Sequence, residues 1–283
     1  MNTVFIIINI AIMLLFIGIL IGMQRKYVSF SKRVFAGLGL GILLGAFLQI
    51  AYSADSEVVT ATTDWYNIVG RGYVRLLMMI VIPLVMVSII QSIINLEKSS
   101  ELGKMSAWII GILVSTAMVA AVVGVTSSSI FNLNADQIEM GQAEQERAAS
   151  LEETLGSVEG MTTPQKILEF IPSNIFLDMT GERATSVIAV VIFSILVGVA
   201  VLGVRRKQPE QADKFVDIVN TFYTVIMRIV TIILRLAPFG ILGLMANTVA
   251  QTNVAGIIEL GKFVGASYFA LIIMFIIHMI LLA

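Results

Sequence analysis

Residues 72–95 read GYVRLLMMIVIPLVMVSIIQSIIN, an apolar run that opens near Arg75 and holds one proline, Pro83, close to its middle. A proline inside a helix removes a backbone donor and clashes with the preceding turn, so in water it usually ends the helix. In a membrane such a proline is tolerated because neighbouring helices satisfy the freed backbone groups. The stretch therefore predicts a membrane helix that is buried among other helices.

The composition of the whole chain agrees with this interpretation. Its 283 residues are 58% hydrophobic and 13% charged, whereas soluble domains are about half apolar and about a quarter charged. The chain contains no cysteine, which excludes a disulfide framework, a thiolate metal site and a cysteine nucleophile. The sequence therefore predicts an all-α, polytopic membrane protein.

Seven segments are long and apolar enough to cross a bilayer, which takes roughly 20 mostly apolar residues. The third and the sixth are long enough to be tilted or kinked, and Pro83 and Pro238 are the expected kink points. The first has no basic segment before it and no small-residue cleavage site after it, so we interpret it as a retained helix and not a signal peptide. The expected spans are 3–24, 33–52, 65–95, 104–131, 184–204, 214–250 and 256–283.

The charges of the connecting loops alternate along the chain. Basic residues gather at 25–33 and 205–214, whereas 55–64 and the long segment 132–173 are mainly acidic. Because basic loops stay on the cytoplasmic side, we expect the N-terminus and 132–173 outside and 205–214 in the cytoplasm. The segment 132–173 is interpreted as an exterior linker, since loops tolerate insertions.

Small residues recur at spacings that suit close helix packing. The second span holds Gly37, Gly41 and Gly45, and the first holds Gly18 and Gly22. In lipid, small residues four apart let two helix backbones approach closely. We interpret both sets as packing signals that are not specific to a function.

The fourth expected span, 104–131, holds the candidate cation ligands Ser115 and Thr116. Hydroxyls deep in a membrane helix most often bond back to their own backbone. The alternative is that they supply oxygen ligands to a dehydrated cation such as Na⁺. Beside them lies a stripe of small residues on one helix face, predicted to pack closely on another helix: Ala117, Ala120, Ala121 and Gly124.

Ionisable side chains inside membrane spans indicate function by default. Arg228 and Arg235 are seven residues apart in the sixth span and share one face. They could bind a substrate carboxylate, or they could pair within a scaffold or extend toward the membrane surface. His278, the only histidine, is interpreted as an interhelical hydrogen-bond donor in preference to a proton relay.

Motifs of enzymes are missing from the sequence. It contains no H-E-x-x-H, no G-x-S-x-G, no pair of intramembrane aspartates and no glycine-rich phosphate loop. We therefore expect a protein that is not an enzyme.

Several stretches together resemble the sodium-coupled dicarboxylate and amino-acid symporters, the glutamate-transporter family. The extra apolar residues 3–24 and the linker MQRKYVSFSKRVF resemble one branch of it, the bacterial sodium-dependent L-cystine uptake proteins. The stretches that resemble shared helices of the family are RVFAGLGLGILLGAF (33–47), GYVRLLMMIVIPLVMVSII (72–90), SVIAVVIFSILVGVAV (186–201) and ILRLAPFGILGLMANTVA (233–250).

The resemblance implies secondary active transport, namely sodium-coupled symport of an amino acid, with L-cystine the expected substrate. It implies Na⁺ or H⁺ as coupling ion, no other cofactor, no nucleic-acid partner, and a homotrimer in the lipid bilayer of the cell membrane. By position Thr116 matches a polar cation-site position of the family's third shared helix, whereas Ala117 and Leu113 depart from the family pattern. The alternative is a non-transporting membrane scaffold or regulatory subunit.

The resemblance also implies a division of the chain into scaffold and mobile transport-domain helices. The family pattern continues with two re-entrant hairpins and two further helices, so we expect this sequence to hold the front part of that pattern. The expected parts are an extra helix with a basic cytoplasmic linker (1–32), scaffold helices (33–95 and 174–250), transport-domain helices (96–131 and 251–283) and the acidic exterior linker (132–173).

Overall fold

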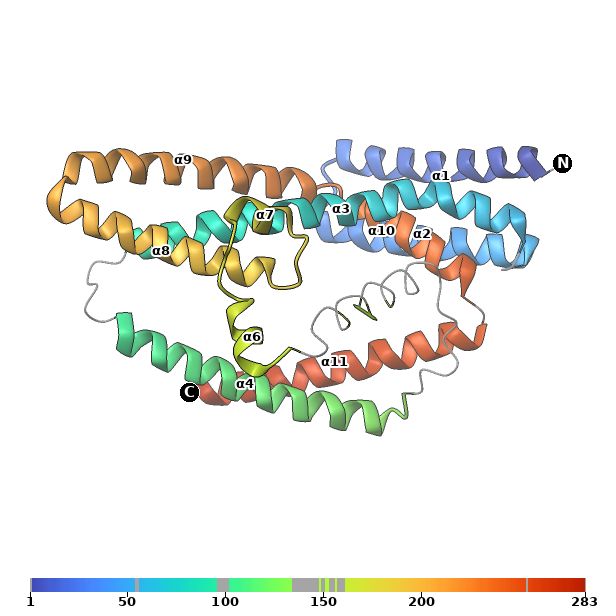
Figure 1. Ribbon diagram of the computed structural model, residues 1–283. Coiled ribbons are helices and arrows are strands. Elements are labelled where there is room, and N and C mark those ends of the chain that lie inside the picture. Colours follow the sequence, from blue (N-terminus) through green and yellow to red (C-terminus); the bar gives the residue numbers. More distant parts are fainter. Residues whose placement is uncertain are drawn as a thin grey trace. The chain divides into compact units, whose positions relative to one another are not determined.

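A computed structural model describes residues 2–53, 56–95, 102–133, 148, 151–152, 156, 161–252 and 254–282. Over these ranges every regular element is a helix (Figure 1). The segment 132–173 lies outside the described residues for most of its length. The long helices are α1 (Asn2–Arg25), α2 (Phe30–Tyr52), α3 (Glu57–Ile94), α4 (Leu102–Ile130), α8 (Ser186–Lys207), α9 (Pro209–Leu234), α10 (Ala237–Gln251) and α11 (Val254–Leu282), and the short ones are α6 (Thr163–Leu168) and α7 (Ile175–Thr180).

Seven helices are long and apolar enough to cross a membrane: α1, α2, α3, α4, α8, α9 and α11. This confirms the prediction of an all-α, multi-pass membrane protein with seven spans. The structure differs from the expectation at 214–250, which is divided into α9 and α10 at Arg235 and Leu236. Pro238 lies in the first turn of α10, where its missing N–H costs no helical hydrogen bond. In contrast, α3 continues past Pro83.

The chain forms two compact units. The first contains residues Met1–Leu96 and Gln142–Gln251, and thus α1 to α3 and α6 to α10. The second contains residues Glu97–Gly141 and Thr252–Ala283, and thus α4 and α11.

A glycine-mediated contact between α2 and α10 lies at the centre of the first unit. A Cβ atom added at Gly41 or Gly45 would lie 2.7 Å from the carbonyl oxygen of Leu242 or Ala246, respectively, and one added at Gly37 would meet that of Pro238. Residue numbers increase in the same direction along both helices at these contacts, so the two helices run parallel, and their backbones touch. The packing prediction is confirmed for these three glycines.

For Gly18 and Gly22 of α1, the described residues provide no such contact, and close packing stays a prediction. A Cβ atom added at either position would meet nothing within 4 Å. The same four-residue spacing of glycines thus accompanies close packing in α2 and no described contact in α1.

Helix α1 packs along α3 in the same direction. The Tyr66 hydroxyl donates a 3.0 Å hydrogen bond to the backbone carbonyl of Asn9, and both residues are fully buried. Near the two helix starts, Asn2 Nδ2 donates to Glu57 Oε2 at 3.2 Å. Leu20 is buried in the same apolar cluster as Tyr66. These contacts join α1 to the rest of the first unit.

Helices α8 and α9 pack against the C-terminal half of α3 through an apolar cluster that includes Val87, Val201 and Val216. Polar contacts also cross this packing, since Gln91 Nε2 donates to Asn220 Oδ1 at 2.9 Å and Arg205 Nη1 donates to the carbonyl oxygen of Ile94 at 3.2 Å. The long α3 therefore carries two groups of helices, with α1, α2 and α10 on its first half and α8 and α9 on its second.

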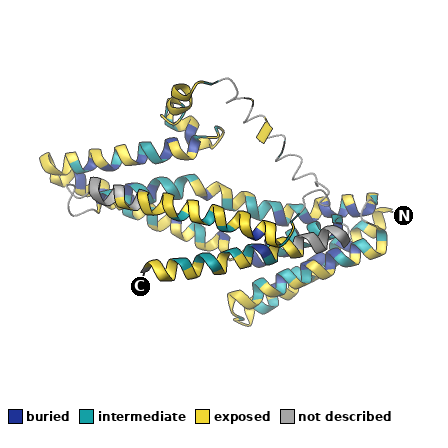
Figure 2. Cartoon of the chain, turned by 90° about the horizontal axis from the view of Figure 1, so that it is seen from below, coloured by how far each residue is buried: buried dark blue, intermediate teal, exposed yellow. Residues whose placement is uncertain are grey.

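The second unit consists of α4 and α11, which run antiparallel (Figure 1). The Ser127 hydroxyl donates a 2.7 Å hydrogen bond to the carbonyl of Ala266, and the rings of Phe131 and Phe269 lie 5.9 Å apart. Most of the other described side chains of α4 are exposed (Figure 2).

Candidate functional site

The candidate cation ligands lie in the middle of α4. The Thr116 hydroxyl donates to the carbonyl oxygens of Ile112 at 2.8 Å and Leu113 at 3.1 Å, and the Ser115 hydroxyl donates to Ile112 at 2.9 Å. Thr116 is half-buried and Ser115 is exposed. The backbone bonding that the sequence offered as one interpretation is therefore present at both positions.

These bonds do not prevent the hydroxyls from acting as ligands. Each hydroxyl uses its proton within α4, and its oxygen still has lone pairs with which to accept a bond. Ser115 lines a hollow of about 400 Å³ together with Trp108, Gly111 and Ile112. Thr116 does not line that hollow, although both hydroxyls bond to the same carbonyl oxygen, that of Ile112. In the described part of the chain, no group of three or more His, Asp or Glu side chains could hold a metal ion.

The small-residue stripe beside Thr116 has no close partner among the described residues of the second unit. Ala117, Ala121 and Gly124 are exposed, and a Cβ atom added at Gly124 would meet nothing within 4 Å. The contact with α11 instead uses the C-terminal end of α4, at Ser127 and Phe131. Close packing of the stripe remains a prediction.

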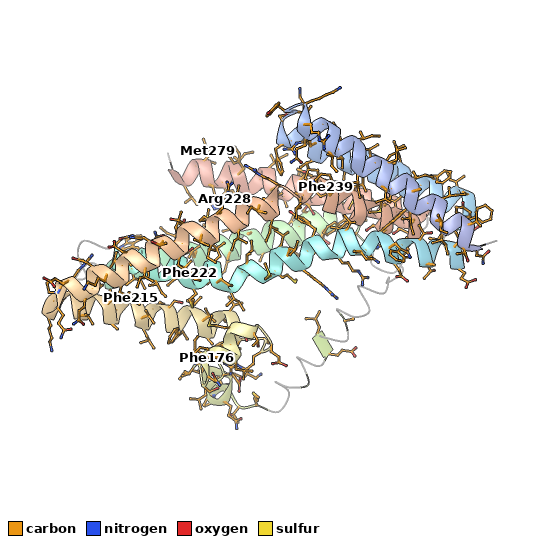
Figure 3. The ribbon with its side chains drawn as sticks, turned by 90° about the horizontal axis from the view of Figure 1, so that it is seen from above. Phe176, Phe215, Phe222, Arg228, Phe239 and Met279 are labelled. Carbon is orange, nitrogen blue, oxygen red and sulfur yellow. The ribbon has the colours of Figure 1, made fainter. Side chains whose placement is uncertain are left out.

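Arg228 and Arg235 lie far from these hydroxyls in the sequence and belong to the first unit. Arg228 is on α9, the helix that also carries Phe222 and Phe215, and Arg235 follows the end of that helix (Figure 3). Both arginines are exposed, and neither guanidinium has an ion-pair partner among the described residues. The structure does not bring them together with another candidate site residue.

His278 bonds within its own helix. Its Nδ1 atom lies 2.7 Å from the carbonyl oxygen of Met274, one turn earlier in α11. The interpretation of His278 as an interhelical donor is therefore not supported by this contact, because in a helix the histidine side chain reaches the preceding turn more readily than a neighbouring helix.

Sequence reasoning missed an ion-pair network between α7 and the start of α8. Arg183 Nε donates to Asp178 Oδ1 at 2.8 Å, and Arg183 Nη1 lies 3.4 Å from Glu169 Oε2. Asp178 is fully buried, whereas the Arg183 and Glu169 side chains are 23% and 43% exposed. Gly181, with φ of 76°, ends α7 and turns the chain so that Arg183 reaches back. The Asn174 cap and Gly181 were the available signals in the sequence.

Comparison with known proteins connects these features to a family. The family model described as "Sodium:dicarboxylate symporter family" matches residues 30–283. The chain is 50% identical over 283 residues to the L-cystine uptake protein TcyP of Bacillus cereus, and 51% identical over 280 residues to TcyP of Bacillus licheniformis. It is 52% identical over 274 residues to TcyP of Shouchella clausii.

The matches cover 97–100% of this chain but only 59–61% of the three relatives. The chain therefore spans about three fifths of the length of the curated relatives that it matches. The family match covers all of the chain except α1 and the linker that follows it. From this match and from the identity to the three uptake proteins, we conclude that the chain belongs to the sodium:dicarboxylate symporter family.

Proposed function

We propose that this chain takes part in sodium-coupled uptake of an amino acid, with L-cystine as the substrate. The observation that carries the proposal is the identity of about half of the residues to L-cystine uptake proteins along the whole chain. That identity includes α1, which lies outside the residues matched by the general family model. A non-transporting scaffold is less well supported, because the relatives are named for uptake.

We further propose that the first unit belongs to a static scaffold and the second to a mobile transport domain. The division of the described helices into two compact units supports this assignment. Because the backbones of α2 and α10 touch, few side-chain rearrangements could accommodate a movement between these two helices. Such a contact suits a scaffold that keeps one shape. In the family's pattern, the scaffold helices would also hold three copies together as a homotrimer.

For the coupling ion we propose Na⁺, with Thr116 as one oxygen ligand and Ser115 beside it. The hydroxyl proton of Thr116 is already committed to α4, which leaves its oxygen lone pairs for a cation. For Arg228 and Arg235 we propose a structural role at the surface of the scaffold, because both are exposed and neither lines the hollow beside Ser115. Substrate contacts are expected from parts of the family pattern outside this chain.

The proposal is tested with a chimera in which these 283 residues replace the matching part of the Bacillus cereus relative. The purified chimera is reconstituted in vesicles, and uptake of labelled L-cystine is measured with an inward Na⁺ gradient, with an inward proton gradient, and with neither. Uptake that depends on the Na⁺ gradient is expected. Uptake driven only by the proton gradient would refute sodium coupling, and no uptake by a chimera that folds like the relative would refute the participation of these residues in transport.

The role of Thr116 is tested in the same chimera. Thr116→Val keeps the shape and removes the oxygen, so Na⁺ binding is expected to weaken by about 1–3 kcal/mol. That corresponds to roughly a 5-fold to 150-fold rise in the Na⁺ concentration needed for half-maximal cystine uptake. Thr116→Ser keeps the oxygen and is the matched control, expected to behave like the unchanged chimera. Equal Na⁺ dependence of the valine variant would make Thr116 a packing residue only.

A further inference from the structure

A groove of about 680 Å³ lies in the first unit where α1, α3 and α10 meet. Its walls are almost entirely apolar and include Ile17 of α1, Leu76 and Met79 of α3, and Leu236 and Phe239 next to and in α10. Phe239 is labelled on α10 in Figure 3. Two of these helices, α1 and α3, are long and apolar enough to cross a membrane, so a lipid is an occupant that suits an open apolar groove between them.

Arg75 is the one charged residue among those that line this groove. It is exposed, and its guanidinium has no ion-pair or hydrogen-bond partner in the described part of the chain. An arginine within a membrane-spanning helix is costly unless an anion or water compensates its charge. The groove therefore combines a long apolar surface with a single unmatched positive charge.

We propose that this groove binds an anionic phospholipid, with an acyl chain along the apolar walls and the phosphate paired with Arg75. A phospholipid is the abundant membrane ligand that joins an apolar chain to an anion. The planar guanidinium matches phosphate oxygens with two parallel hydrogen bonds, which a neutral side chain cannot supply. Basic pockets between membrane helices are known to hold acidic lipid headgroups.

Helix α1 is part of this site, because Ile17 forms one of its walls. The hydrogen bond from Tyr66 to the Asn9 carbonyl joins α1 to α3 nearer the starts of the same two helices. The matched family region begins at residue 30, so the site depends on a helix that the general family match does not include. The inference rests on the membrane location of the chain and does not depend on the transported substrate.

The experiment uses the full chain, purified in detergent and incubated with either phosphatidylglycerol or phosphatidylcholine of the same acyl chains. Native mass spectrometry counts the lipids that remain bound. We expect one phosphatidylglycerol to be retained at concentrations about tenfold below those needed for phosphatidylcholine. Arg75→Gln should remove this difference, and Arg75→Lys should keep part of it, because lysine retains the charge without the paired bonds.

A second variant tests the apolar part of the groove. A Cβ atom added at Gly72, which lines the groove, would meet nothing within 4 Å, so Gly72→Leu places its side chain in open space. It should lower retention of both lipids. The matched control is Gly39→Leu in α2, where an added Cβ atom also meets nothing within 4 Å and which does not line the groove. Arg228→Gln is the charge control, being exposed and outside the groove.

Three results would overturn the proposal. Equal retention of the two lipids would exclude recognition of the anion. An equal loss of phosphatidylglycerol with Arg228→Gln and with Arg75→Gln would mean that the lipid responds to net charge alone. If Gly72→Leu changes the mass of the protein assembly and leaves the number of bound lipids unchanged, the groove is a contact between copies of the chain. If Gly72→Leu fails to fold, the two lipids and the Arg75 variants decide the question by themselves.

Discussion

The contact between α2 and α10 predicts opposite consequences for two neighbouring glycines of one helix. At Gly41 an added Cβ atom would lie 2.7 Å from Leu242 O and 2.8 Å from the Met245 Cβ atom, whereas at Gly39 it would meet nothing within 4 Å. Gly41→Ala therefore forces the two backbones apart. Gly39→Ala adds the same methyl group to open space.

The magnitude follows from the distances. Ordinary van der Waals contact begins at 3.4 Å, so α10 must move away by several tenths of an ångström. A gap of about 0.5–1 Å forfeits a quarter to a half of the dispersion energy of each contact along the helix pair. Overpacking of this kind costs about 1–3 kcal/mol. The gain in helix propensity from glycine to alanine, about 1 kcal/mol, is common to both variants and cancels in the comparison.

The assay is the midpoint of heat-induced unfolding, measured on the purified proteins by fluorescence-detected size exclusion. At about 2–4 °C for each kcal/mol, Gly41→Ala should unfold about 2–12 °C below Gly39→Ala. Gly45→Ala should behave like Gly41→Ala, since its Cβ atom would lie 2.7 Å from Ala246 O. If Gly41→Ala is as stable as Gly39→Ala, the two backbones do not touch and the reasoning fails.

Three further predictions concern other contacts. Asp178→Asn should lower the free energy of unfolding by about 2–3 kcal/mol, because Arg183 loses a buried charged acceptor. Glu169 is more exposed, so Glu169→Gln should lower it by less than about 1 kcal/mol. Equal losses of stability in thermal unfolding would contradict this. Tyr66→Phe should cost about 1 kcal/mol by removing the hydrogen bond from Tyr66 to the Asn9 carbonyl, and an unchanged unfolding midpoint would argue against the contact between α1 and α3. The chain has no cysteine, so Ser173→Cys and Gln208→Cys each give one labelling site, and an impermeant thiol reagent applied to cells should react with the first and spare the second. The reverse pattern would invert the proposed orientation.

The spans were predictable from the sequence because each depends on its own apolar length. The contacts between the spans were less predictable, because each contact also depends on the residues of another helix. Gly41 and Gly18 look alike in the sequence, but only Gly41 faces a helix backbone, and that backbone lies about 200 residues further along the chain. The proline rule anticipated a bend at Pro238, and the structure has a new helix start there instead.

The candidate site shows the same limit. The bonds from Ser115 and Thr116 to their own backbone were among the expected interpretations because they are local to one turn. The pairing of Asp178 with Arg183 escaped prediction because it requires the left-handed turn at Gly181, and a charge pair five residues apart has no helical periodicity. The ligands that would complete a cation site cannot be inferred from α4 alone, since oxygen ligands come from elements distant in sequence.

The parallel contact of α2 with α10 has a consequence for biosynthesis. A ribosome that adds about 5–20 residues per second needs about 10–40 s to proceed from Gly37 to Pro238. Throughout that interval the glycine face of α2 is in the membrane without its partner, and its exposed backbone is open to lipid or to another newly made helix. Conditions that slow elongation after α2 lengthen this interval and should therefore increase mispairing of this helix.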